Sequence, residues 1–132
     1  MDPIDTVRRY AEAWQANDID TVLALYDDDF TLHYFGDSPL AGDHAGKDAA
    51  TRVLFEATRR SERQLERIED VLGGDTFAAL VAREALGDPP RVVRRVFLYR
   101  VRNGRLIECW LFDEDQRFVD RLWSASGAPR PS

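Results

Sequence analysis

A tight hairpin near the carboxyl-terminal end constrains this chain more than any other feature. Asn103-Gly104 separates two apolar-rich runs, residues 91–101 and 105–113, and this dipeptide readily adopts the positive φ angles of a type I′ turn. Counting outward from the turn gives the expected pairs. One face would carry Leu98 with Cys109, Val96 with Leu111 and Arg94 with Asp113, and the other Tyr99 with Glu108, Phe97 with Trp110 and Arg95 with Phe112. Both faces are largely apolar, so we expect a pocket, a helix layer or another subunit to cover each one.

Composition and charge limit the classes of function. With 44% hydrophobic and 32% charged residues, the 132 residues fit one globular domain over 1–125, followed by a flexible polar tail over 126–132. The net charge of −6 disfavours nucleic acid and anionic membranes as partners. No apolar run reaches the roughly twenty residues that cross a bilayer, and the opening MDPID does not resemble a secretion signal. We therefore expect a cytoplasmic protein that contacts neither membrane nor nucleic acid.

Hydrophobic spacing predicts helices in the first part of the chain and strands in the second. Helical intervals between apolar residues cover residues 3–15, 19–26, 47–60 and 116–123. Strand composition covers residues 30–35, 64–72, 77–86, 91–101 and 105–113. The turn-forming stretch 36–46 is expected to be a connector. This order predicts an α+β fold in which three N-terminal helices pack in a strongly curved antiparallel sheet.

Three stretches resemble one protein family in their order and spacing. They are RRYAEAWQANDIDTVLALYDDDFTL, PLAGDHAGKDAA and NGRLIECWLFDEDQRFVDRLW, within residues 4–124. Together they resemble the NTF2-like cone of the ketosteroid isomerases and the SnoaL-like polyketide cyclases, and most closely the SnoaL-like branch that ends in a DQ…D..W pattern. The resemblance implies a homodimer, a deep apolar pocket between sheet and helices, and no cofactor.

The functional residues of the isomerases match this sequence only in part. Their oxyanion tyrosine falls on Tyr10, and their second pocket tyrosine falls on Tyr26. The position of their general-base aspartate falls at His33 or Tyr34, and that of their second pocket aspartate falls near Val93 or Arg94, so neither acid is present. Because steroid isomerisation needs both acids, we do not expect that reaction here.

An acid at the end of the last strand is the leading candidate for chemistry. The expected register places Asp113 beside Arg94, at the open end of an apolar cavity. Epoxide hydrolases of this family resemble the chain in pairing an arginine with an aspartate across neighbouring strands. The position of their second acid, two residues after the arginine, is occupied by Val96 here. Asp113 could act as an acid or base, or could form a structural ion pair with Arg94.

His33 is the second candidate. It could serve as a pocket base near neutral pH, or it could be a buried, hydrogen-bonded structural histidine. His33 and His44 with Asp37 and Asp43 match no metal-ligand spacing, so we expect no metal site.

The expected pocket lining comes from two sources. By their spacing alone, Trp14, Tyr26, Phe30, Val53 and Leu54 are core residues, and the family resemblance makes them pocket lining as well. The hairpin register adds Val96, Leu98, Cys109 and Leu111. Cys109, the single cysteine, is expected to be a small buried hydrophobic residue.

Three functional hypotheses follow. The first is a cofactor-free isomerase, cyclase or hydratase acting on a small apolar molecule, with Asp113 and His33 as proton carriers and Tyr10 and Arg94 as polarising groups. The second is a binding module that holds such a molecule without turnover. The third is a dimeric scaffold that pairs through the sheet face of Phe97, Tyr99, Trp110 and Phe112.

Overall fold

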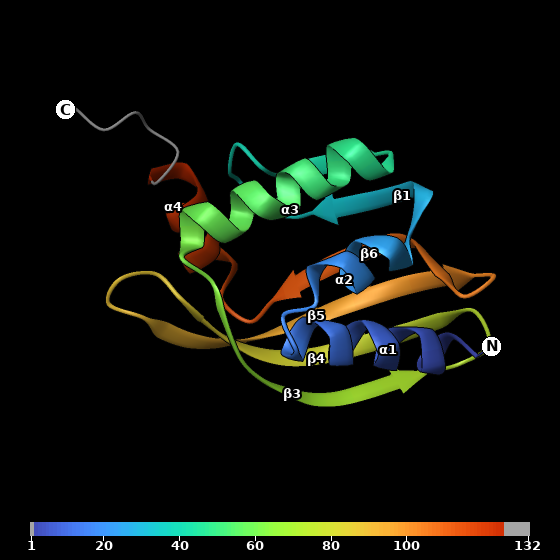
Figure 1. The fold of residues 1–132 in the computed structure, drawn as a ribbon. Coiled ribbons are helices and arrows are strands. Elements are labelled where there is room, and N and C mark those ends of the chain that lie inside the picture. Colours follow the sequence, from blue (N-terminus) through green and yellow to red (C-terminus); the bar gives the residue numbers. More distant parts are fainter. Residues whose placement is uncertain (1, 126–132) are drawn as a thin grey trace.

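A strongly curved sheet wraps around the helices in the computed structural model, which describes residues 2–125 (Figure 1). The six strands, in the order β2-β1-β6-β5-β4-β3, are β1 (Tyr26–Tyr34), β2 (Gly42–Ala45), β3 (Gln64–Gly73), β4 (Phe77–Leu86), β5 (Arg91–Arg102) and β6 (Arg105–Asp113). The helices are α1 (Pro3–Gln15), α2 (Ile19–Leu25), α3 (Lys47–Ser61) and α4 (Gln116–Ala125). This arrangement confirms the expected α+β class, while the expected tail over 126–132 lies outside the described residues.

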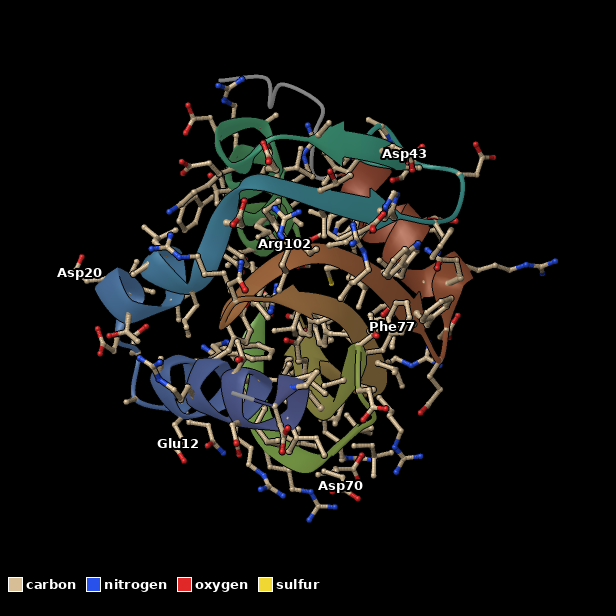
Figure 2. The ribbon with its side chains drawn as sticks, turned by 90° about the vertical axis from the view of Figure 1, so that its right-hand side faces the viewer. Glu12, Asp20, Asp43, Asp70, Phe77 and Arg102 are labelled. Carbon is tan, nitrogen blue, oxygen red and sulfur yellow. The ribbon has the colours of Figure 1, made fainter. Side chains whose placement is uncertain are left out.

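The helices occupy one side of the curved sheet. The first helix packs on β3, β4 and β5, and α3 crosses β1 and β2. Asp43 on β2 and Asp70 on β3 mark the two edge strands in Figure 2. Because α1 and α3 lie over opposite halves of the sheet, a space remains between them that the side chains fill only in part.

Local sequence explains where the helices begin and end. Pro3 occupies the first turn of α1, where its missing N–H costs no hydrogen bond. Asp18 caps α2 by accepting from the backbone N–H of Thr21 at 3.2 Å. Glu62 ends α3 in the left-handed region, with φ of 48°, and so turns the chain sharply into β3. This reversal places Arg63 at the start of β3, facing the space between α1 and α3.

The hairpin turn is confirmed, but the expected register beyond it is wrong. Asn103 and Gly104 have φ angles of 52° and 72°, as a type I′ turn requires, and Arg102 pairs with Arg105. The register then shifts: Val101 pairs with Leu106, whereas Arg100 pairs with Glu108. Ile107 is therefore the extra residue of a β-bulge, and both Leu106 and Ile107 are buried.

This bulge changes which side chains of β5 share a face of the sheet with those of β6. Tyr99 pairs with Cys109, Phe97 with Leu111 and Arg95 with Asp113, all facing the helices. Val96 and Leu98 face outward together with Trp110 and Phe112. The expected inner pairs of Arg94, Val96 and Leu98 are wrong, and so is the expectation that Phe97 and Tyr99 lie on the outer face.

Two further features of the sheet differ from the expectation. β1 runs parallel to β6, so the sheet is mixed and not purely antiparallel. Residues 42–45, which lie in the expected connector, form the edge strand β2 and pair with β1. The pairing of β1 with β6 joins segments that are distant in sequence, and hydrophobic periodicity within one strand carries no information about it.

Candidate functional site

A cavity of about 700 Å³ opens between α1, α2, α3 and the start of β3. Its apolar and aromatic wall includes Tyr10, Trp14, Ile19, Val22, Leu23, Tyr26, Leu54, Phe55 and Leu65. Its polar wall includes Gln15, Asn17, Thr51, Thr58, Arg63, Gln64, Glu66 and Arg67. A concave, mostly apolar space with a few polar groups is the usual form of a small-molecule site.

Two tyrosine hydroxyls meet at the inner wall of the cavity. The hydroxyl oxygens of Tyr10 and Tyr26 lie 2.6 Å apart in a buried hydrogen bond. The Tyr10 ring also packs against Tyr99, with ring centroids 5.4 Å apart. Burial raises the pKa of Tyr10 and raises that of Tyr26 well above its usual value. Both hydroxyls are therefore neutral at physiological pH, and because one donates to the other, the pair has one O–H left to donate elsewhere.

Arg63 brings a positive charge to the same wall. Its Nε donates to Glu84 Oε1 at 2.8 Å, and its guanidinium lies over the Trp14 ring, 4.7 Å from the ring centroid. Burial, the largest single influence, would lower the pKa of Arg63, but the charge of Glu84 together with smaller contributions from Tyr34 and Tyr10 raises that pKa overall. The guanidinium is thus fully charged in a position where its side chain is only 10% exposed.

Behind Arg63 lies a network of buried charges from three neighbouring strands. Arg95 donates from Nη1 to Glu84 Oε2 at 2.7 Å and from Nε to Asp113 Oδ1 at 2.6 Å. The side chains of Arg95, Glu84 and Asp113 are 1%, 0% and 2% exposed. Burial by itself would lower the pKa of Arg95, whereas the charges of Glu84 and Asp113 raise it. Each of these charged groups has lost its hydration, so its stability in the folded protein depends on the oppositely charged groups bonded to it.

The structure places four of the expected pocket residues on the cavity wall: Tyr10, Trp14, Tyr26 and Leu54. Phe30, Cys109 and Leu111 belong to the buried core, with Val53 packed against it, and none of the four is part of that wall. Val96 and Leu98 lie on the outer face for the reason given above. Burial raises the pKa of the Cys109 thiol, in keeping with a small buried hydrophobic side chain. The binding role of the four wall residues remains a prediction.

The expected partner of Asp113 is wrong by one residue. Arg95, not Arg94, pairs with Asp113, and the side chain of Arg94 is exposed and bonded to Glu69 at 2.7 Å. Asp113 does face inward, as expected, but it lies behind Arg95 and outside the cavity wall. The position two residues after Arg95 is Phe97, so the corrected pair also lacks the second acid of the epoxide hydrolase pattern.

His33 lies on the opposite, outer face of the sheet. Its Nδ1 is 2.6 Å from Asp43 Oδ1, and its Nε2 is 2.5 Å from Glu108 Oε2. Glu108 also accepts from Arg100 Nε at 3.0 Å, and the His33 ring stacks on Trp110. Partial burial would lower the pKa of His33, but its bonds to Asp43 and Glu108 raise it. His33 is therefore a sheet-bridging residue, remote from the cavity.

Sequence reasoning missed Arg63, Glu84 and Arg95. A signal for Glu84 was present, because a period of two along 77–86 places it in the same row as Ala78, Leu80, Ala82 and Leu86. An acid within a buried apolar row requires a cationic partner. Arg95 occupies the equivalent position before Phe97 and Tyr99 on β5.

Two other kinds of site are absent from the described part of the chain. Histidine, cysteine and acidic side chains between residues 2 and 125 form no group of three or more able to hold a metal ion. None of the helices in this range combines the length and the apolar character needed to span a membrane.

Comparison with known proteins establishes the family. The SnoaL-like domain family matches residues 7–109, so the chain belongs to this family. No curated protein sequence gives a significant match.

Solved structures share the NTF2-like fold at low sequence identity. A Xanthomonas campestris protein of unknown function with a cystatin-like fold is 23% identical, covers 94% of this chain and 99% of its own, and gives a TM-score of 0.85. An NTF2-like protein from Burkholderia xenovorans is 21% identical, with coverage of 92% and 95% and a TM-score of 0.70. TerC, co-crystallised with polyporic acid, is 13% identical, with coverage of 92% and 98% and a TM-score of 0.75.

The buried network predicts a large effect of Glu84→Gln on stability. This change leaves the buried guanidinium of Arg63 without a carboxylate and that of Arg95 with Asp113 alone. It should reduce the free energy of unfolding by about 3–5 kcal/mol. Urea unfolding followed by tryptophan fluorescence measures the loss. Glu69→Gln is the control, because Glu69 pairs with the exposed Arg94 and its loss should barely move the midpoint. Equal midpoints for the two variants would contradict the assigned role of Glu84.

The outer cluster predicts a pH-dependent contribution from His33. Because folding raises its pKa above the usual 6.5, its stabilisation is complete below that value and is lost as the pH rises through the folded-state pKa. His33→Gln should therefore reduce stability by about 1 kcal/mol more at about pH 6 than at about pH 9. Thermal unfolding at the two pH values tests this. His44→Gln is the control, since His44 bonds to the backbone oxygen of Leu40; a pH-independent loss in His33→Gln would refute the assignment.

Proposed function

We propose that this protein binds a small, largely aromatic or aliphatic molecule in the cavity between α1, α2, α3 and β3. The observation that carries the proposal is the cavity itself, about 700 Å³ in size with an aromatic wall and a buried guanidinium. Sites of this size and composition typically enclose most of a drug-sized molecule. Trp14 and Tyr26 supply flat apolar surfaces, while Arg63 and Tyr10 supply donors that would fix the orientation of a ligand.

The same wall favours binding and polarisation over proton abstraction. Asp113 lies behind Arg95, and His33 lies on the outer face. Glu66, the carboxylate among the described lining residues, is exposed to solvent and paired with Arg83 at 3.6 Å. Neutral tyrosine hydroxyls and a guanidinium can stabilise negative charge that develops on a ligand oxygen. Catalysis at this site would therefore use Tyr10 and Arg63 as polarising groups, and would take its base from the ligand or from water.

A structural neighbour supports a small-molecule role. TerC, which has the same fold, was co-crystallised with polyporic acid. Fold alone does not transfer a ligand between proteins, so the support is for the type of site and not for that compound.

A neutral hydrophobic dye tests the binding proposal. When Nile red binds the protein, its fluorescence should increase and shift to the blue, because the cavity shields the bound dye from water. Leu54→Trp should weaken its binding by about tenfold or more by filling the cavity. Leu72→Trp is the control, because Leu72 is exposed on β3 and outside the cavity wall. The proposal is wrong if the unaltered protein does not bind the dye, or if Leu54→Trp binds it as well as the control does.

The outer sheet face supports a second element of the proposal, a homodimer. Phe112 is 46% exposed and stacks on the exposed Phe35, while Trp110 packs against the exposed Phe77. With Val96 and Leu98, these side chains form an apolar face on the side of the sheet away from the helices. Such a face is suited to a second copy of the chain, and the family resemblance implies a homodimer as well.

Charge placed in this face should separate the protomers. We expect Phe112→Glu to shift the sedimentation coefficient from dimer to monomer, because the two-fold arrangement would bury the introduced carboxylate on both sides. Leu72→Glu, equally exposed but on the edge strand β3, should leave the assembly unchanged. A monomeric parent protein, or a Phe112→Glu variant that remains dimeric, would exclude this interface.

A further inference from the structure

The guanidinium of Arg63 has donors that the protein itself does not use. Only its Nε takes part in a hydrogen bond among the described residues, to Glu84 Oε1. An arginine carries five N–H donors in a planar fork, so the N–H groups on the two terminal nitrogens remain available. Since Arg63 lines the cavity and its side chain is nearly buried, a molecule in the cavity is in a position to accept from them.

The charges behind Arg63 alternate in sign away from the cavity. Arg63 bonds to Glu84, Glu84 bonds to Arg95, and Arg95 bonds to Asp113. Each carboxylate therefore lies on the far side of a guanidinium, and the positive end of the series faces the cavity. In this partly desolvated site, electrostatic attraction for a nearby negative oxygen is stronger than it would be in water.

Two aromatic rings and one carboxylate limit how a ligand can reach Arg63. Its guanidinium lies over the rings of Trp14 and Phe97, with Cζ 4.7 and 5.7 Å from their centroids. Because Nε is bonded to Glu84, the donors left for a ligand are those on the two terminal nitrogens, along one edge of the fork. A planar group with two oxygen atoms fits that edge, as in bidentate arginine–carboxylate pairs.

We propose that the cavity selects a monoanionic organic acid, with an aromatic or aliphatic body against Trp14 and Leu54 and its carboxylate on Arg63. The inference rests on the binding function proposed above and deepens it by assigning the chemical class of the ligand. A monoanion matches the single guanidinium that faces the inner cavity. Arg67, the other arginine of the wall, is largely exposed and already paired with Glu69 at 3.5 Å.

Cinnamate and cinnamamide provide a direct test on the unaltered protein. The two probes have the same planar aromatic body and differ in the charge of the head group. We expect calorimetry to show cinnamate binding about tenfold or more tightly than cinnamamide, as for a charge-assisted hydrogen bond set against a neutral one. Equal affinity, or tighter binding of the amide, would overturn the assignment of an acid while leaving a binding cavity. Failure of both these probes and of Nile red to bind would reject the cavity function as well.

Variants then assign the preference to one residue. Arg63→Lys keeps the charge next to Glu84 but removes the fork, so the ratio of the two affinities should fall by about threefold or more. Arg63→Met should bring the ratio of the two affinities to about one, provided that circular dichroism shows a folded variant. If Arg63→Met does not fold, Arg63→Lys still tests the assignment. Arg67→Gln, on the exposed part of the same wall, should keep the full ratio. A preference that survives in Arg63→Lys and is lost in Arg67→Gln would refute the role of Arg63.

Discussion

One extra residue in β6 determines which side chains enter the interior of this protein. The bulge at Ile107 shifts the pairing of β5 and β6 by one position, so that Arg95, Phe97 and Tyr99 face the helices. A one-residue slip in a sheet moves every side chain of a strand to the other face. Without the bulge, Arg94 instead of Arg95 would share a face with Asp113, and the guanidinium of Arg95, which now bridges Glu84 and Asp113, would lie on the other face of β5 relative to Asp113.

Much of the fold could be predicted from the sequence, because its signals are local. Periodicity located the helices and the long strands, and Asn103-Gly104 correctly predicted the hairpin turn. The parallel pairing of β1 with β6 could not be obtained in this way, since it joins residues about one half of the chain apart. Burial alternates along residues 106–111 of β6 except at the consecutive buried residues Leu106 and Ile107, but the sequence does not mark this bulge, because residues 109–112 are also consecutive apolar residues.

The candidate site was harder to predict because its key residues depend on partners from other elements. Tyr10, Trp14, Tyr26 and Leu54 were found through helical spacing and family resemblance, and they do line the cavity. Arg63 follows the end of α3 within a mixed run of charges, so in the sequence it looks like a surface residue. Its burial follows from three contacts that are distant in sequence, with Trp14, Glu84 and Phe97.

The energetics of buried charge connect the network to the cavity. Burying Arg95, Glu84 and Asp113 requires removing three charges from water, and apolar side chains of similar volume often give equal or greater stability. Stability alone is therefore a weak explanation for this arrangement. What apolar residues could not provide is the carboxylate that holds Arg63 by its Nε on the cavity wall and leaves its terminal nitrogens unused by the other described residues. The network is best explained as the rigid support of one positively charged group in an otherwise largely apolar and aromatic pocket.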